Sequence, residues 1–332
     1  MTIKTECLSL HQQFPPRLST MRTTVGLRFL YGYMKYDKLP IDLPQQLEKL
    51  KQRGLTIANE EMALEQLHSI SYFRLASYWG SMENQADKHQ FLPNSNFEDI
   101  INTYTFDKKL RTLVFISIQD IEIALRTRII QFFSLKYGSF WFMDASLFKD
   151  ATIHDACMKN IEKEVLRSKE EFLTEHFAKY DEPSLPPVWK TLEVASFGTL
   201  SKLYCNFKDT EVKKQVARSL ALPQYIYLES WLKCATVLRN LCAHHSRLWN
   251  RRFAWKPQLP QRMPLNWLQN IQYIRPIKLY AQFCYLAYLE QSINPNSAFR
   301  KEIVDLLNDK PKHTLKAMGF PENWQSEPLW NY

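Results

Sequence analysis

The chain has 332 residues, of which 45% belong to the AVILMFWYC set and 14% are aromatic, so it can form a sizeable core and is not a disordered protein. Its seven glycines lie too far apart for the glycine-rich loops of Rossmann dinucleotide-binding and P-loop proteins. The net charge is +9, and the six cysteines form no CxxC pair, which is typical of thiols that stay reduced. The composition therefore predicts a mainly helical, cytoplasmic protein.

The two ends of the chain differ from its middle. Residues 1–33 show no helical period and contain Pro15-Pro16, which indicates an extension outside the fold. The most apolar segments, 112–135 and 277–293, are interrupted by charged residues before reaching about eighteen apolar residues, so no membrane span is expected. We divide the remainder into a domain at 34–255 and a C-terminal helical region at 256–332 that packs on it.

Helical signals run through both parts of the chain after residue 33. Gly54 ends the first predicted helix, Asn59 caps the second, and Gly138 ends a long segment that is one helix or two stacked ones. In that segment Ile116, Ile123, Ile130 and Phe133 are near helical spacing, and we assign them to the core. The expected helices are 43–53, 59–80, 97–137, 154–180, 189–207, 210–220, 225–250, one after Pro276, and 296–308.

Basic and aromatic residues are concentrated near the end of the 34–255 domain and just beyond it. Between Ser230 and Leu289 there are nine lysines and arginines and no aspartate or glutamate. Six Trp, Tyr and Phe residues are interleaved with the cations up to Tyr273, a mixture that suits an RNA backbone with unstacked bases. The same composition also fits a basic surface above ordinary core aromatics.

The segment RNLCAHHSRLWNRR, residues 239–252, lies in the helix predicted to reach about Asn250. On an ideal helix, with about 100° per residue, its two adjacent histidines point in different directions. His245 joins an apolar face and is expected to be a hydrogen-bonded core residue, whereas His244 shares a polar face with Asn240. Arg239 lies about 140° from His244, so their cooperation requires a bent-back arginine, a distorted helix, or another copy of the chain.

Histidine and arginine together can catalyse metal-independent RNA cleavage, in which the neighbouring 2′-OH is the nucleophile. The candidate catalytic residues are Arg239, which binds phosphate, His244, which transfers a proton, and Asn240, which orients His244. The candidate RNA-binding residues are Arg247, Arg251 and Arg252. A zinc site of Cys242, His244 and His245 is the weaker alternative, because adjacent histidines diverge on a helix and no second ligand cluster has zinc-finger spacing. We therefore assign no metal and no cofactor.

Two further groups have both structural and functional interpretations. Glu122 and Arg126 are four residues apart on the central helix, and we interpret them as a structural pair rather than as groups in an RNA cleft. The block around Tyr72, Arg74 and Trp79 could stack on a base or bind phosphate, but aromatic blocks of this kind are more often core. Neither group is assigned to the site.

Several sequence blocks in a fixed order carry a family resemblance. They include SISYFRLASYW, FEDIINTYTFDKKLR, PPVWKTLEVASFGTLSKLY and LRNLCAHHSRLWNRRF, and they extend from about Met34 to Phe253. The chain resembles the Abi-like bacterial abortive-infection proteins of the AbiD and AbiF type, which belong to the HEPN superfamily. The HEPN signature, an arginine followed four to six residues later by histidine, is matched by Arg239, Asn240 and His244.

This resemblance implies an all-α, HEPN-type helical bundle with additional helices. It implies an endoribonuclease of a phage-defence or toxin-antitoxin system, with RNA as its substrate and a small RNA or protein antitoxin as a further partner. Relatives pair two HEPN units around one cleft, and this chain has one signature, so the resemblance suggests a homodimer with a composite site. The alternative is a helical RNA-binding protein of a defence system that has no cleavage activity.

Overall fold

The computed structural model describes residues 36–84, 86–87 and 89–331, and the predicted extension at 1–33 lies outside them. The described residues form helices and only isolated β-bridges, which confirms the all-α fold class. Among these residues no helix is both long and apolar enough to cross a membrane. The α-helices are α2 (Leu43–Gln52), α3 (Glu60–Ile70), α4 (Tyr72–Trp79), α5 (Phe97–Tyr137), α6 (Ala151–Arg167), α7 (Glu171–Phe177), α8 (Val188–Val194), α9 (Phe197–Asn206), α10 (Thr210–Ser219), α11 (Tyr225–Ala243), α12 (Leu279–Ile293), α13 (Phe299–Asn308) and α14 (Lys312–Met318). The 3₁₀ turns are η1 (Trp141–Met143), η2 (Ala145–Leu147), η3 (Ile271–Tyr273), η4 (Trp324–Ser326) and η5 (Pro328–Trp330).

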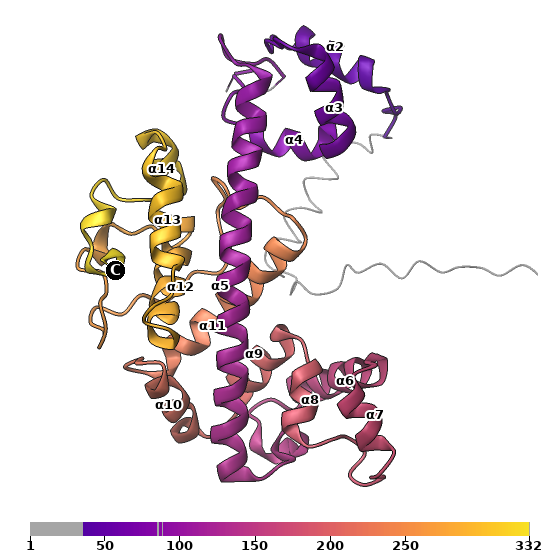
Figure 1. Ribbon diagram of the computed structural model, residues 1–332, viewed down its shortest axis with the longest axis vertical. Coiled ribbons are helices and arrows are strands. Elements are labelled where there is room, and N and C mark those ends of the chain that lie inside the picture. The colour runs from indigo at the N-terminus through magenta and orange to yellow at the C-terminus, as the bar shows by residue number, and fades with distance from the viewer. Residues whose placement is uncertain (1–35, 85, 88, 332) are drawn as a thin grey trace, which may run out of the picture.

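Helix α5 is the central element of the molecule. It is a single helix of 41 residues, about 60 Å long, and it runs along the long axis in Figure 1. Asn96 caps its first turn by accepting a hydrogen bond from the Asp99 N–H, and Gly138 ends it with a left-handed backbone at φ +81°. Helices α2–α4 lie beside one end, α6–α9 beside the other, and α12–α14 along the opposite side (Figure 1).

Three predicted helices are each broken into two. The segment expected at 59–80 forms α3 and α4, with Ser71 between them at φ +69°. The segment expected as one helix at 154–180 forms α6 and α7, with Ser168 extended between them. The segment expected at 189–207 forms α8 and α9, because Ser196 is extended and caps α9 by accepting from the Thr199 N–H. In each case buried apolar residues lie on both sides of the break, so hydrophobicity alone did not reveal it. A serine lies at each break, and Ser71 and Ser196 cap the helices that follow them by accepting a hydrogen bond from the first turn.

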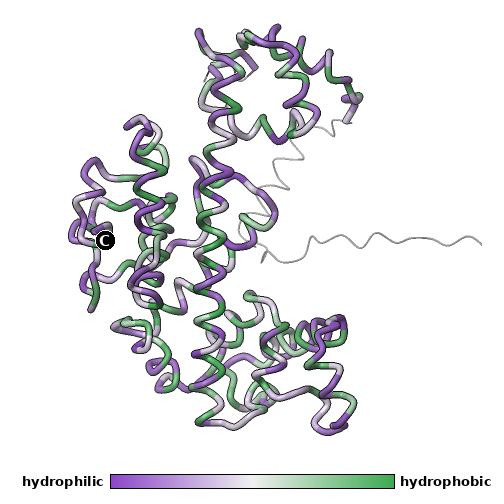
Figure 2. Tube along the Cα trace, in the orientation of Figure 1, coloured by the Kyte–Doolittle hydropathy of each residue, from purple (hydrophilic) through white to green (hydrophobic). Residues whose placement is uncertain are grey.

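The core face of α5 differs from the one predicted. Ile116 and Ile123 were assigned to the core, but they are 51% and 64% exposed. The buried face carries other apolar residues, and Figure 2 shows hydrophobic positions recurring along the whole helix. Because α5 is apolar on more than one side, spacing does not identify the side that the neighbouring helices cover. Phe133 is fully buried, as predicted, and the buried aliphatic residues are Ile100, Leu110, Val114, Ile118, Ile121, Leu125 and Ile129.

Ile121 and Ile123 provide a matched test of this assignment. Ile121→Ala is expected to lower the free energy of unfolding by about 2–5 kcal/mol, because it removes a fully buried side chain and leaves a cavity. Ile123→Ala is expected to change it by about 0.5 kcal/mol or less, since that side chain is exposed. Urea denaturation at low protein concentration measures both values. Equal losses would show that the two faces of α5 are assigned incorrectly.

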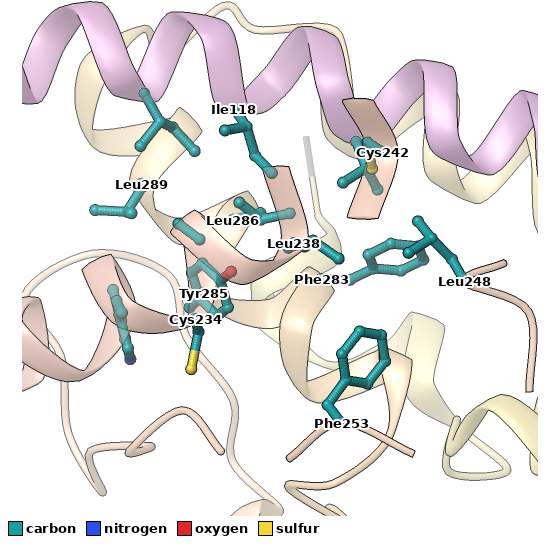
Figure 3. Packing of buried hydrophobic residues seen from close by; sticks show 14 of the residues in the cluster. Ile118, Cys234, Leu238, Cys242, Leu248, Phe253, Phe283, Tyr285, Leu286 and Leu289 are labelled. Atoms are coloured by element: carbon teal, nitrogen blue, oxygen red, sulfur yellow. The ribbon is translucent and has the colours of Figure 1, made fainter. Parts of the chain in front are cut away.

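Helix α11 is held by α5, α9 and α10 in the middle of the molecule. In Figure 3, Leu238 and Cys242 of α11 gather with Ile118 of α5 and Phe283 of α12 in one buried cluster. Helix α12 is buried on every side from Leu279 to Glu290, and it also packs against α5. The last turn of α11 is therefore fixed by packing on both sides.

Candidate functional site at the end of helix α11

Helix α11 ends at Ala243, and the prediction that it continues to Asn250 is wrong. His244 is its C-cap residue and His245 has a left-handed backbone, with φ +55°. The Ser246 N–H donates to the Leu241 carbonyl at 2.8 Å, and the His245 N–H donates to the Cys242 carbonyl at 3.0 Å. This pair of hydrogen bonds is the Schellman motif, which usually has glycine at the left-handed position. Without a glycine, the sequence shows no local stop signal here.

The two histidines are both exposed, so the expectation that His245 is a core residue is wrong. The carbonyl of His245 accepts a hydrogen bond from Arg74 Nη1 of α4 at 2.8 Å. Cys242 instead faces the core, and burial raises the pKa of its thiol to about 12. The predicted zinc alternative therefore fails on geometry, since Cys242 and the two imidazoles occupy different environments. No group of three or more His, Cys, Asp or Glu side chains that could hold a metal ion occurs within the described ranges.

A buried carboxylate from α5 anchors the chain after α11. Asp107 accepts hydrogen bonds from the N–H groups of Leu248 at 3.0 Å and Trp249 at 2.6 Å. It also accepts from the Tyr78 hydroxyl at 2.7 Å and is paired with Arg111. Burial raises the pKa of the Asp107 carboxyl and of the Tyr78 hydroxyl. These bonds pull residues 248–249 toward α5 and so support the turn that ends α11.

Asp107 was not predicted from the sequence as part of this region. Its only sequence signal is Arg111 four residues later inside a mostly apolar helix, a spacing that often indicates a surface pair. Arg74 was considered only as a core or RNA-contacting residue, whereas its guanidinium supports the carbonyl of His245. Both contacts join residues that are far apart in the sequence.

The three candidate catalytic residues lie at the last turn of α11. Arg239 is directed to α5, where its Nε lies 4.0 Å from Glu122 Oε2, and its side chain is 40% exposed. Its Nη1 also lies 3.5 Å from Asn240 Oδ1, a long hydrogen bond. Asn240 and His244 are exposed and joined through the main chain, because the His244 N–H donates to the Asn240 carbonyl at 3.0 Å. The Asn240 side chain is thus joined to Arg239, and no side-chain hydrogen bond between Asn240 and His244 is found in the described part of the chain.

Glu122 connects the candidate site to the rest of the fold. Arg126 Nη2 donates to Glu122 Oε1 at 2.7 Å, as expected for a structural pair one turn apart. The same guanidinium donates through Nη1 to the Ala195 carbonyl at 2.8 Å and to the Leu192 carbonyl. Arg239 therefore approaches a carboxylate that is already fixed against the loop between α8 and α9.

The three candidate RNA-binding arginines occupy different environments in the segment after α11, not one helix face. Arg247 donates to the Ser77 carbonyl and lies over the Trp249 ring, with its Cζ 5.9 Å from the centroid. Arg251 Nη1 donates to the Arg247 carbonyl at 3.0 Å, and burial lowers the pKa of Arg251. Arg252 is exposed. Arg247 and Arg251 thus help to shape the segment, whereas Arg252 presents its charge to solvent.

These environments separate the expected effects of two alanine substitutions. If the segment after α11 binds RNA, Arg252→Ala should lower the slope of log K against log[salt] by about 0.7 and should leave the melting temperature unchanged. Arg247→Ala should lower both the affinity and the melting temperature, because it also removes a hydrogen bond and packing on Trp249. Lys159→Ala, on the exposed face of α6, is the charge-matched control. An unaltered salt slope for Arg252→Ala would argue against a phosphate contact.

The comparisons with known proteins cover the part of the chain that contains this site. The family model described as Abi-like protein matches residues 65–250, which is 186 of the 332 residues and includes all of α4 to α11. No curated protein and no solved structure matches the chain. The family match supports a role in abortive infection, a form of phage defence. Because the matched range spans more than half of its length, the chain belongs to the family of Abi-like proteins.

Proposed function

We propose that the protein is a metal-independent endoribonuclease of an abortive-infection or toxin-antitoxin system, with Arg239, Asn240 and His244 as its catalytic residues. The observation that carries the proposal is the last turn of α11, where an exposed imidazole and a partly exposed guanidinium lie on a rigid, buried helix. Rigid support is what a positioned catalytic group needs. The match of this turn to the HEPN signature adds the expectation of RNA as substrate.

The residues can perform each part of the reaction. The 2′-oxygen of the substrate attacks the adjacent phosphorus, the bond from phosphorus to the 5′-oxygen breaks, and the products carry a 2′,3′-cyclic phosphate and a 5′-hydroxyl. His244 either removes the proton of the attacking 2′-OH or delivers a proton to the departing 5′-oxygen, because imidazole can both accept and donate a proton, and water takes or supplies the other proton. Arg239 binds the phosphate and stabilises the negative charge that develops on its oxygens. Asn240 holds the guanidinium through its side-chain oxygen.

A homodimer fits the surface beside the site. Ile116 and Ile123 form an exposed apolar strip on α5, and Glu122, next to Ile123, approaches Arg239. An isologous contact that buries this strip would place the two Arg239 and His244 sets on either side of one interface. The composite site that the family resemblance suggests would then lie between the two copies.

Two measurements test the dimer. Ile123→Glu should convert the dimer into an inactive monomer by light scattering and cleavage assay, whereas Ile153→Glu, on the exposed face of α6, should not. Mixing Arg239→Ala with His244→Ala protein should give activity that differs from the average of the two parents, because a mixed dimer combines residues from both chains. A fully active monomer would rule out the shared site.

The experiment that tests the activity is incubation of RNA with the purified protein in EDTA. Cleavage that leaves 2′,3′-cyclic phosphate ends supports the proposal. Intact RNA that remains bound supports the alternative, a helical RNA-binding protein without cleavage activity. Activity that EDTA abolishes would indicate a metal-dependent nuclease instead. A small RNA or protein antitoxin should suppress the cleavage if the protein belongs to a toxin-antitoxin pair.

A further inference from the structure

A surface pocket lies in the C-terminal region, outside the residues that the family model matches. It has a volume of about 590 Å³ and opens between η3, the segment that precedes α12, and α14 with the loop after it. This volume is within the range of pockets that bind small ligands. The residues of its wall that bear on its chemistry are Tyr273, Arg275, Lys312, Lys316, Phe320 and Glu322.

The wall of this pocket combines an exposed aromatic ring with several cations. Tyr273 is 69% exposed, whereas Phe320, which also lines the pocket, is buried. Arg275 Nη2 donates to the Lys316 carbonyl, which holds the guanidinium against the end of α14. Glu322 is the carboxylate in the wall, and Lys312 lies 3.5 Å from it. The pocket therefore carries a net positive charge beside a ring that can stack on a planar group.

A series of cations connects the pocket to the end of α11. The Phe253 N–H donates to the Ile277 carbonyl at 2.8 Å, so the segment after α11 pairs with the segment before α12. Lys278 Nζ donates to Asn250 Oδ1 at 3.1 Å. Burial lowers the pKa of Lys278, and the positive charges of Arg275, Arg252 and Arg247 lower it further. We call these four cations, Arg247, Arg252, Lys278 and Arg275, the basic track.

The backbone at the pocket is closely packed against the basic track. Gly319 has a left-handed backbone with φ +94°, and a Cβ there would lie 2.4 Å from Lys278 Cβ. Only glycine allows α14 to end this close to Lys278. Gly319, which lines the pocket, is thus packed directly against Lys278 of the basic track.

We propose that the pocket binds one nucleotide of a single-stranded RNA, with its base stacked on Tyr273 and its phosphate paired with Arg275, Lys312 and Lys316. The adjoining phosphates follow the basic track to the last turn of α11. RNA as the ligand rests on the proposed function, whereas the aromatic ring and the cations also suit a free mononucleotide, which shares the same chemistry. The C-terminal region then determines which RNA strands the protein holds, by binding nucleotides at a distance from the scissile bond.

The test uses the full-length protein and a short 2′-O-methylated RNA that cannot be cleaved and that carries one 4-thiouridine. Irradiation should crosslink the RNA to Tyr273 or to the peptide around Phe320, as mapped by mass spectrometry. Tyr273→Ala should weaken binding about fivefold or more, because stacking on an aromatic side chain contributes about 1–3 kcal/mol per base. Replacing Lys312 and Lys316 together by alanine should lower the slope of log K against log[salt] by about 0.7 for each phosphate contact that is lost. Tyr36→Ala and Lys159→Ala, both at exposed positions, should bind like the wild type.

Wild-type affinity and an unchanged salt slope in the pocket variants would overturn the proposal. If uridine monophosphate protects Tyr273 from chemical modification and the oligonucleotide does not, the ligand is a free nucleotide and the RNA assignment is wrong. These measurements require no cleavage, so they separate the two proposals. If RNA binding depends on the pocket residues but the protein does not cleave RNA in EDTA, the pocket proposal stands and the nuclease proposal is wrong. If the protein cleaves RNA and Tyr273→Ala changes neither binding nor cleavage, the nuclease proposal stands and the pocket proposal is wrong.

Discussion

Replacing His244 by alanine is expected to lower the rate of RNA cleavage by about 10² to 10⁴, the usual contribution of a positioned acid-base group. Folding and most of the RNA affinity should remain, because the imidazole is exposed. The hydrogen bond from the main-chain N–H of residue 244 to the Asn240 carbonyl also survives the substitution. Single-turnover kinetics with saturating protein measures the rate, and a thermal melt measures the fold. Arg239→Ala should lower both the cleavage rate and the RNA affinity, since the guanidinium binds the phosphate and also stabilises the charge that develops on it.

His245→Asn is the matched control for His244→Ala. It removes an adjacent exposed imidazole from a left-handed position that asparagine tolerates well, and the backbone bond from Arg74 to the carbonyl is preserved. The variant should cleave RNA at the wild-type rate and melt at the same temperature or slightly higher. Full activity in His244→Ala would contradict the catalytic role, and equal losses in both variants would indicate damage to the turn instead.

Asp107→Asn is expected to lower the free energy of unfolding by about 3–5 kcal/mol, the usual effect of removing one partner of a buried ion pair. The substitution leaves Arg111 without its carboxylate and weakens the acceptor for the Leu248 and Trp249 N–H groups. The turn after α11 should become more mobile. Hydrogen exchange of residues 244–249 should therefore increase more than exchange in α6.

Asp155→Asn provides the control with the same spacing. Asp155 pairs with Lys159 one turn later on the exposed face of α6, so its loss should have little effect on the free energy of unfolding. Guanidinium denaturation compares the two variants directly. A similar small effect for Asp107→Asn would show that the buried carboxylate does not anchor this segment.

Much of the fold follows from local sequence signals. The Asn96 cap and Gly138 mark both ends of α5, and the helical class follows from composition and hydrophobic period. The residues of the candidate site were also identified from sequence, by the family blocks and the HEPN signature, although their catalytic roles remain a prediction. In each case the determining groups lie within a few residues of one another or in an ordered series of motifs.

The tertiary structure alone decided where α11 ends and which side of α5 is buried. The end of α11 depends on the N–H groups of Leu248 and Trp249 meeting Asp107, more than a hundred residues earlier in the chain. The same turn places His245 in solvent, against the prediction from an ideal helix. On α5, apolar residues occur on several faces, and only the neighbouring helices determine that Ile121 is covered and Ile123 is not. Local sequence specifies helix formation, because those hydrogen bonds join residues four apart, but the end of this helix and the side of α5 that is covered depend on partners that folding brings together.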